Sequence, residues 1–366
     1  MFVTVGPGQY HRKAGLLSDA GLYINKFGTT AVLIGGNTSR RVIEGPLRRS
    51  LAEYGMTLKH SLCFGGESSQ TNIDRLVDQL KNETFDVLIA AGGGKALDKV
   101  KSVAFHLNKP LVAIPIIAAT YAAATPICIL YSDEGDFLEI GRKSKAPELV
   151  LVDTNVILHA PVRYLIAGIG DTLAKWFETK CSIKKAVPNA INQTAIAIAG
   201  HLYQTLIQNG MKAVASIQKQ KLTRELDDLI DAIILVSGSV SGYGGDDCRT
   251  AAAHAIYSGL TIFPEIHDTY HGEIVAFGIL AQLCMEGTEE EEVRSLIHFY
   301  QEVGLPCTLQ QMAIKGLTEE QWNTLGEITV TIEDMANMPF EVTPDMVITS
   351  IRHADRIGTE MLVVSK

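Results

Sequence analysis

Short apolar runs alternate with amphipathic segments along the first part of the chain. Runs typical of buried strands occur at residues 2–5, 30–34, 57–64, 87–91, 110–115 and 149–152. Segments whose apolar positions recur at helical spacing lie between them, at 14–27, 40–54, 69–81 and from Ala96 onward. Two shorter runs, 127–131 and 137–140, flank an Asp-Glu-Gly-Asp turn and predict a hairpin. This order predicts a parallel sheet covered by helices, in which ligands bind beyond the carboxyl ends of the strands.

The pattern changes after Pro161, where strand-like runs largely stop. Helical patterns then follow one another at 162–182, 189–209, 222–241, 249–259, 271–286 and 289–303, with several more after Leu317. No stretch rich in Ser, Gly or Pro separates the two parts. We therefore expect two domains that pack directly, an α/β domain over residues 1–161 and an all-α domain over 162–366.

The clearest candidate for ligand binding is the stretch FDVLIAAGGGKALDKVK, residues 85–101. An apolar strand ends in three glycines, and a helix begins directly after them. Free amides at such a helix start can bind an anion, and glycine lets a diphosphate approach the backbone. The spacing matches neither a P-loop nor G-x-G-x-x-G, so an ordinary glycine-rich tight turn is the alternative.

Composition narrows the class of protein. The chain has 366 residues, 46% of them hydrophobic and 20% charged, which is typical of a globular protein. A formal net charge of −9 argues against nucleic acid as a partner. Six widely spaced cysteines without a C-x-x-C pair suggest reduced thiols, and no signal peptide or membrane span is expected. We therefore expect a cytoplasmic globular protein that is neither exported nor associated with membranes.

Three polar residues of the helical part lie in strongly apolar surroundings. Asp171 lies in AGIGDTLAKWFE, His254 in AAAHAIYSGL and His271 in HDTYHGEIVAFG. Asp171 can equally be a helix cap or a partner of Lys175, and a single histidine among apolar residues is commonly a satisfied core histidine. His267 and His271, four positions apart, are another pair that can share a helix face. Spacing alone leaves these alternatives open.

Taken together, the sequence motifs decide between these alternatives, because they resemble the motifs of a known family. AGGGKALDKVK, AIPIIAATYAAATP, LVDT, AGIGDTLAKWFE, AAAHAI and YHGE occur in this order over essentially the whole chain. The chain thereby resembles the glycerol dehydrogenase and hydroxycarboxylate dehydrogenase A branch of the iron-containing alcohol dehydrogenase superfamily, whose fold is shared with dehydroquinate synthase. The resemblance implies a dinucleotide-binding α/β domain, a helical domain and one divalent metal in the cleft between them. It implies Asp171, His254 and His271 as metal ligands.

The resemblance also bears on the metal and the cofactor. The iron-dependent branch has a further histidine four residues after the aspartate, where this chain has Lys175. Three ligands with an open position favour zinc. For NAD(P), the resemblance implies that Gly93, Gly94 and Lys95 contact the pyrophosphate. It implies that Thr125, Ile127 and Tyr131 contact the nicotinamide half. Ile116 and Ala119 replace hydroxyl residues that glycerol dehydrogenases use near the cofactor.

Two departures from the family pattern concern specificity. Tyr121 replaces an aspartate that binds a substrate hydroxyl in glycerol dehydrogenases, which weakens polyol binding and removes repulsion toward a carboxylate. Asn37, followed by Arg40 and Arg41, replaces the aspartate that binds the ribose diol in NAD-selective members. This favours NADP(H), whose 2′-phosphate can pair with arginine. The alternative is that both arginines are solvent-exposed residues at the start of a helix and do not bind the cofactor.

Arg249 is the candidate for binding a substrate carboxylate. It precedes His254 by five positions, and the surrounding glycines and alanines predict a helix that begins near position 249. An arginine at such a start can hold a carboxylate with both arms of its guanidinium. The hydroxycarboxylate relatives also have an arginine here. An ion pair with Asp246 or Asp247 is the alternative.

The leading hypothesis is a metal-dependent, NAD(P)-linked oxidoreductase that acts on a small hydroxy acid or 2-oxo acid and forms a homo-oligomer. A glycerol or other polyol dehydrogenase is the alternative of the same class. A dehydroquinate synthase-like lyase is an alternative of another class, but it needs many basic residues around a phosphorylated substrate. The segment 171–180 offers only Lys175 and Lys180. A non-catalytic nucleotide sensor would not need all three metal ligands.

Overall fold

The computed structural model describes residues 3–135, 137–141 and 144–364. The chain divides into two compact units. One, the α/β unit, comprises Thr4–Pro161 and Ser216–Gly238, and the other, the helical unit, is made chiefly of Val162–Ala215 and Ser239–Lys366. The expected limits of 1–161 and 162–366 thus differ from this division in two segments, because Ser216–Gly238 groups with the α/β unit and Val3 with the helical unit.

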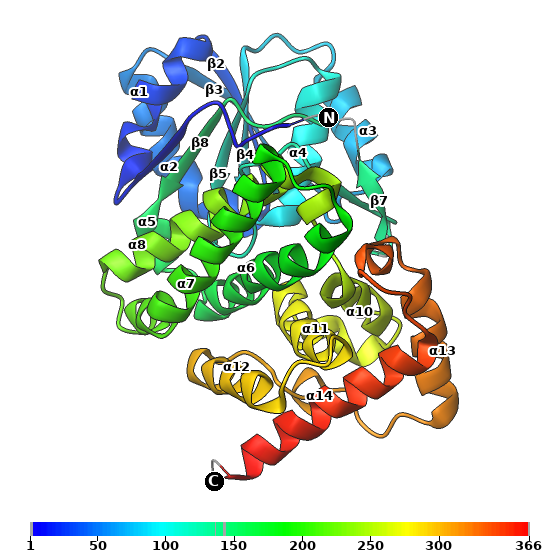
Figure 1. The fold of residues 1–366 in the computed structure, drawn as a ribbon. Coiled ribbons are helices and arrows are strands. Elements are labelled where there is room, and N and C mark those ends of the chain that lie inside the picture. Colours follow the sequence, from blue (N-terminus) through cyan, green and yellow to red (C-terminus); the bar gives the residue numbers. More distant parts are fainter. Residues whose placement is uncertain (1–2, 136, 142–143, 365–366) are drawn as a thin grey trace. The chain divides into compact units, whose positions relative to one another are not determined.

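A six-stranded sheet forms the centre of the α/β unit, in the order β1-β8-β5-β4-β2-β3 (Figure 1). All its neighbouring strands are parallel. The strands are β1 (Tyr10–Lys13), β2 (Thr30–Gly35), β3 (Thr57–Cys63), β4 (Val87–Gly92), β5 (Leu111–Pro115) and β8 (Leu149–Asp153). A separate antiparallel hairpin consists of β6 (Cys128–Tyr131) and β7 (Phe137–Gly141). The parallel sheet and the hairpin are therefore confirmed.

Helices cover both faces of this sheet. The helices of the unit are α1 (Ala20–Ile24), α2 (Asn37–Glu53), α3 (Gln70–Leu80), α4 (Gly94–His106), α5 (Thr154–Leu158) and α8 (Arg224–Asp231). Alternate strand residues such as Leu33 and Ile89 pack with Leu47 of α2 in one apolar core. Their strand neighbours Val32 and Leu88 are equally buried, on the opposite face. Burial of both faces explains why the strands have continuous apolar sequences.

The register brings three strand ends to one edge of the sheet. Gly35 of β2 lies opposite Ala91 of β4, and Gly92 of β4 lies opposite Pro115 of β5. The segments that follow these strands therefore begin at the same edge. They contain the predicted cofactor residues Asn37, Gly93, Gly94, Lys95 and Ile116.

The segment Ser216–Gly238 is attached to the α/β unit by polar contacts to the edge strand β1. Tyr10 Oη donates to Asp231 Oδ1 at 2.7 Å, and Arg12 Nε donates to the same oxygen at 2.8 Å. Arg12 also pairs with Asp227 at 2.6 Å. A five-residue π-helical stretch, Ala232–Val236, follows α8 and leads into α9 (Ser237–Gly244).

The helical unit contains long helices with few other regular elements. They are α6 (Val162–Ser182), α7 (Ala190–Gln218), α9, α10 (Ala252–Leu260), α11 (His271–Met285), α12 (Glu290–Val303), α13 (Glu319–Thr331) and α14 (Pro344–Val364). The α7 helix starts in this unit and ends in the α/β unit. Helix α11 is apolar around its whole circumference and buried, because it packs against α6, α10 and α14. No helix among the described residues is both long and apolar enough to cross a bilayer.

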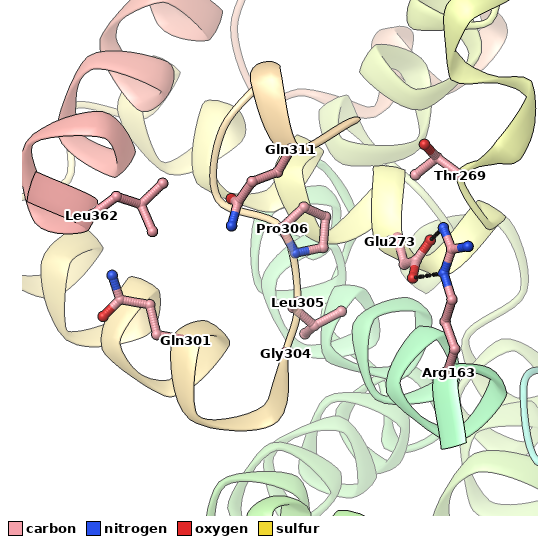
Figure 2. Close-up of a pocket in the computed structure, with 9 residues that line it drawn as sticks. All are labelled: Arg163, Thr269, Glu273, Gln301, Gly304, Leu305, Pro306, Gln311 and Leu362. Carbon is pink, nitrogen blue, oxygen red and sulfur yellow. Dashed lines mark hydrogen bonds and ion pairs between the residues drawn. The ribbon is translucent and has the colours of Figure 1, made fainter. Parts of the chain in front are cut away.

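The helical unit also has an open pocket of about 510 Å³ (Figure 2). An ion pair between Arg163 of α6 and Glu273 of α11 forms part of its wall. The remaining lining residues are uncharged: Thr269, Gln301, Gly304, Leu305, Pro306, Gln311 and Leu362. None of these residues was singled out by the sequence.

Three predicted elements differ from the structure. The strand expected at 2–5 is wrong: Phe2 lies outside the described residues, and residues 3–5 form no strand. The first strand is instead β1, whose polar sequence YHRK lacks an apolar run. The helix expected at 14–27 is broken into α1 and two short 3₁₀ turns. The helix expected to begin near position 249 begins at Ala252.

Candidate metal and cofactor sites

The three predicted metal ligands lie together within the helical unit. Asp171 comes from the middle of α6, His254 from the first turn of α10 and His271 from the first position of α11. Asp171 Oδ1 is 3.5 Å from His254 Nε2 and 3.3 Å from His271 Nε2. One candidate donor atom from each residue lies within 4.8 Å of the others. His267 belongs to a separate 3₁₀ turn and is not part of this group.

Buried charge makes this donor set suitable for a cation. Burial alone would raise the pKa of Asp171, but hydrogen bonds and charges of His254 and His271 outweigh it and hold that pKa well below the ordinary value. For His254, burial acts to lower the pKa, and the carboxylates of Glu178 and Asp171 overcome this and raise it to about 10. The site therefore favours positive charge beside Asp171. One carboxylate and two imidazoles match the ligands of a catalytic zinc ion, with a position left for substrate.

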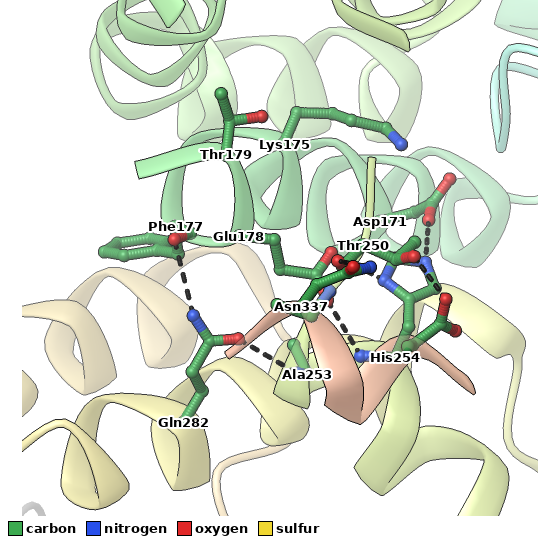
Figure 3. A network of polar contacts seen from close by, with 12 residues as sticks. Asp171, Lys175, Phe177, Glu178, Thr179, Thr250, Ala253, His254, Gln282 and Asn337 are labelled. Carbon is green, nitrogen blue, oxygen red and sulfur yellow. Dashed lines mark hydrogen bonds and ion pairs between the residues drawn. The ribbon is translucent and has the colours of Figure 1, made fainter. Parts of the chain in front are cut away.

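Glu178 orients His254, as Figure 3 shows. Its fully buried carboxylate lies 2.7 Å from His254 Nδ1 and accepts from the backbone N–H groups of Ala251 at 2.7 Å and His254 at 3.0 Å. This carboxylate therefore also caps the start of α10. A carboxylate on one ring nitrogen fixes the tautomer, so that the other nitrogen, here Nε2, can bind metal. Glu178 was not among the predicted site residues, although it follows Asp171 by seven positions and so lies on the same helix face.

Gln282 continues this polar network into the packed helices. Its Oε1 accepts from the N–H of Ala253 at 3.0 Å, and its Nε2 donates to the carbonyl of Phe177 at 3.3 Å (Figure 3). Gln282 is fully buried on α11. It thus links α10, α6 and α11, the three helices that carry the candidate ligands. A buried polar group with these partners specifies one packing arrangement.

In the α/β unit, the predicted glycine turn lies at the junction of β4 and α4. Gly93 is the N-cap of α4, and its carbonyl accepts the first helical hydrogen bond, from Leu97 N. A Cβ at Gly93 would lie 2.8 Å from Ile117 Cδ1, so the loop after β5 covers this turn closely. Free N–H groups at a helix start of this kind bind phosphate oxygens. The predicted turn geometry and helix start are thus present.

Lys95 and Tyr131 lie side by side at this helix start. The Lys95 ammonium is 5.1 Å from the centre of the Tyr131 ring and 2.6 Å from Glu67 Oε2. Glu67 belongs to the loop that follows β3. The charge of Lys95 is therefore balanced by the carboxylate of Glu67.

A buried lysine holds the loop that contains the other predicted cofactor residues. Lys101 of α4 donates to the carbonyls of Ala122 at 2.8 Å, Thr125 at 3.1 Å and Ile127. It also pairs with Asp98 at 2.7 Å. Thr125 is buried, and its Oγ1 has no hydrogen-bond partner among the described residues. Lys101 was not predicted, because a buried lysine in an amphipathic helix resembles a solvated one in sequence.

Three further predicted residues of this loop are half-buried. Ile116 packs partly against the apolar core of the sheet, and Ala119 is half-buried. Tyr121 is half-buried, and its Cβ would lie 3.6 Å from a Cβ at Gly238 of α9. Part of the Tyr121 side chain therefore lies against the backbone at Gly238.

The start of α2 contains Asn37 and both candidate phosphate-binding arginines. Gly36 is the N-cap and Asn37 the first helical residue. Arg40 donates to Asn37 Oδ1 at 2.8 Å and to the carbonyl of Ser61 at 3.2 Å, whereas Arg41 is exposed. Arg40 is thus held beside Asn37, at the end of β2.

Arg249 lies in the irregular turn before α10. Its neighbour Thr250 is anchored on both sides: the hydroxyl donates to Asp334, and the carbonyl accepts from Asn337 Nδ2 at 2.8 Å (Figure 3). Arg249 itself is half-buried and follows the 3₁₀ turn Gly245–Cys248. The fixed turn defines the backbone position of Arg249, five residues from His254.

Comparison with known proteins gives a consistent family. Residues 7–154 match the family model for iron-containing alcohol dehydrogenase. A glycerol dehydrogenase of Thermotoga maritima is 34% identical over 360 residues, which cover 97% of both chains. Hydroxycarboxylate dehydrogenase A of Escherichia coli is 33% identical over 348 residues and 94% of both chains.

A solved structure supports the same relationship. The crystal structure of glycerol dehydrogenase from Schizosaccharomyces pombe has a TM-score of 0.89 at 29% identity, and the match covers 98% of this chain and 92% of that one. The sequence likeness to dehydrogenases thus extends over the parts that carry both candidate sites. The chain belongs to the iron-containing alcohol dehydrogenase family and is an oxidoreductase of that family.

Proposed function

We propose that the protein transfers hydride between NADP(H) and a small hydroxy acid or its 2-oxo acid, with one divalent metal bound by Asp171, His254 and His271. The observation that carries the metal assignment is the convergence of His254 Nε2 and His271 Nε2 on Asp171 Oδ1, at 3.5 and 3.3 Å. A divalent cation at this position acts as a Lewis acid toward a substrate oxygen. Zinc is the metal that suits this donor set.

The residues of the chain have separate tasks in this reaction. Glu178 keeps the proton of His254 on Nδ1, so that Nε2 remains a donor atom. The start of α4 and Lys95 hold the cofactor pyrophosphate, and Lys101 fixes the loop that carries Thr125 and Ile127. Hydride transfer requires that the nicotinamide carbon and the substrate carbon come into contact. The bound cofactor and the bound substrate must therefore lie next to each other.

The preference for a carboxylate substrate rests on two positions. Tyr121 introduces no negative charge near the substrate, and Arg249 offers a guanidinium for the carboxylate. A polyol such as glycerol is the second candidate, because several similar proteins, including one from Pseudomonas putida at 35% identity, are glycerol dehydrogenases. The dinucleotide preference rests on Asn37, Arg40 and Arg41.

The deciding experiment is a substrate screen with the metal-loaded enzyme. Hydroxy acids, 2-oxo acids, glycerol, diols and aldehydes are tested with both NADPH and NADH, or with the oxidised cofactors, and nicotinamide absorbance is followed. We expect the largest kcat/KM for a 2-oxo acid or its hydroxy acid. A larger value for glycerol would favour the second candidate, and elemental analysis without any divalent metal in a fully active sample would refute the metal assignment.

We also expect a homo-oligomer in the cytoplasm. Size-exclusion chromatography with light scattering tests the first expectation, and cell fractionation tests the second.

A further inference from the structure

The distance between two of the candidate metal ligands, Asp171 and His271, depends on how closely α6 and α11 approach each other. Gly170, next to Asp171, faces Gly272, next to His271: a Cβ at Gly170 would lie 2.2 Å from the carbonyl oxygen of Gly272. A Cβ at Gly272 would lie 1.9 Å from the carbonyl oxygen of Ala167. The two helix backbones therefore touch directly beside both ligands. This contact sets the distance between the backbones but leaves the direction of the His271 side chain to other groups.

His271 is less constrained by packing than His254. The His271 side chain is 45% exposed, whereas that of His254 is 12% exposed and paired with Glu178. The Tyr257 ring contacts that of His271 in a T-shaped arrangement, with the two ring centres 4.3 Å apart. His271 is also the first residue of α11, where helices fray. Its orientation therefore depends on whatever fixes the first turn of α11.

Glu273 fixes that turn from within. It is the third residue of α11, it is buried, and its Oε2 accepts from the backbone N–H of Tyr270 at 2.7 Å. This contact spans His271, because Tyr270 precedes it and Glu273 follows it. A carboxylate that bonds back to the N-cap residue in this way closes the first turn of a helix.

Arg163 fixes the same turn from α6. Its Nε donates to Glu273 Oε1 and its Nη2 to Glu273 Oε2, both at 2.7 Å, and Nη2 also donates to the carbonyl of Asp268 at 2.7 Å (Figure 2). The guanidinium lies 4.5 Å from the centre of the Tyr270 ring. Arg163 lies on the helix that carries Asp171, and it thus binds residues that precede and follow His271 in the sequence. A bidentate Arg–carboxylate pair restricts orientation as well as distance.

The geometry points to Arg163 and Glu273 as positioning residues for the metal site: their ion pair holds His271 in the direction that a shared metal with Asp171 requires. This inference rests on the proposed metal-dependent function. Neither residue is a ligand, so their effect is on metal affinity and coordination geometry.

The test compares Zn²⁺ affinity of wild type, Arg163→Gln and Glu273→Gln by competition with a chromophoric chelator. Loss of a partner that orients a ligand costs about tenfold to a hundredfold in metal affinity, and this weakening is expected for both variants. The double variant should be little weaker than either single one, since both remove the same contact. Arg352→Gln is the matched control, because Arg352 also joins two helices through an ion pair, to Glu319 at 2.7 Å.

A second measurement separates positioning from general stability. The Co²⁺-loaded variants should show altered absorption bands at a temperature at which the metal-free forms are still folded, as their own melting curves establish, whereas Arg352→Gln should keep the wild-type bands. Should Arg163→Gln not fold, Arg163→Lys, which keeps the charge but not the fork, is measured in the same way and is expected to lose part of the affinity. Folded variants with wild-type affinity and an unchanged Co²⁺ spectrum would overturn the inference. Wild-type protein that binds no divalent ion would instead refute the proposed metal chemistry, and with it the inference.

Discussion

The imidazole of His254 and the carboxylate of Glu178 form a buried pair, with Nδ1 and Oε2 separated by 2.7 Å. The same carboxylate accepts from the backbone N–H of His254 itself. One residue therefore fixes both the backbone and the ring of the histidine. This arrangement has a direct consequence for metal binding.

Replacement of Glu178 by glutamine should weaken Zn²⁺ binding about tenfold to a hundredfold. The amide oxygen can still accept from the backbone, but a neutral group no longer stabilises Nδ1–H, so His254 Nε2 is less available as a donor. Chelator competition measures the change. Glu319→Gln, an exposed position of α13, is the control and should bind like wild type. Equal affinity of the Glu178 variant and wild type would contradict the role assigned to this pair.

Arg249→Ala should reduce kcat/KM for a 2-oxo acid more than for a neutral aldehyde of similar size. A charge-assisted bidentate contact contributes roughly 1.5–3 kcal/mol, so the expected difference is about tenfold to a hundredfold. Arg224→Ala, an exposed position of α8, serves as a control for the loss of one positive charge. If both substrates lose the same factor, Arg249 has a structural role and does not bind the carboxylate.

The cofactor preference should favour NADPH over NADH by about tenfold or more in kcat/KM, since an arginine contact to the 2′-phosphate is charge-assisted. Arg40→Ala and Arg41→Ala should each reduce the value for NADPH and leave that for NADH nearly unchanged. Arg49→Ala, near the other end of α2, is the matched control. A preference for NADH in wild type would show that neither arginine acts on the cofactor.

Stability at alkaline pH should depend on Lys99. Burial is the largest influence on its ammonium and lowers the pKa from 10.5 to about 8, even though the side chain donates to the carbonyls of Phe64 and Gly66. Between these two values the unfolded chain binds more protons than the folded one, so this group makes the free energy of unfolding rise with pH. The slope should be smaller in Lys99→Met, by urea unfolding at several pH values. Parallel curves for the two proteins would exclude this origin.

Asp231→Asn should lower the free energy of unfolding by roughly 1–2 kcal/mol, because the charge-assisted contact to Arg12 is weakened in a partly buried position. Asp228→Asn on the same helix is the control, since Asp228 is more exposed and its pair with Arg224 is long, at 3.7 Å. Urea unfolding followed by circular dichroism measures both. A similar loss in both variants would show that the contact to β1 adds nothing specific.

The sequence alone was sufficient to predict the structure of segments whose conformation depends on their own residues. The apolar run and glycines of 87–94 predict a strand, a turn and a helix start, and all three are present. The strand β1 could not be recognised, because YHRK becomes a strand only through pairing with β8. The sequence predicts helix at 249–251, but the backbone there is irregular because Glu178, Asp334 and Asn337, which are distant in sequence, hold it.

The candidate site likewise contains residues that the sequence motifs identify and others whose role depends on partners distant in sequence. The resemblance singled out Asp171, His254 and His271, and the structure brings them together. Glu178 and Arg163 lie on the same helix as Asp171, yet their partners are contributed by segments more than seventy positions away. Such pairs exist only once the helices have packed, so no pattern within α6 identifies them.

Residues 216–238 belong to the α/β unit although residues of the helical unit precede them in the chain. This order affects how the protein folds during its synthesis. Tyr10 and Asp231, which bond each other, are 221 positions apart, so the ribosome must add a large part of the helical unit before this contact can form. The α/β unit is therefore complete only once residue 238 has been made, although its residues 4–161 precede the helical segment 162–215. A fragment ending at residue 161 would have the six parallel strands but not this segment. For the same reason, one proteolytic cut cannot release either unit whole.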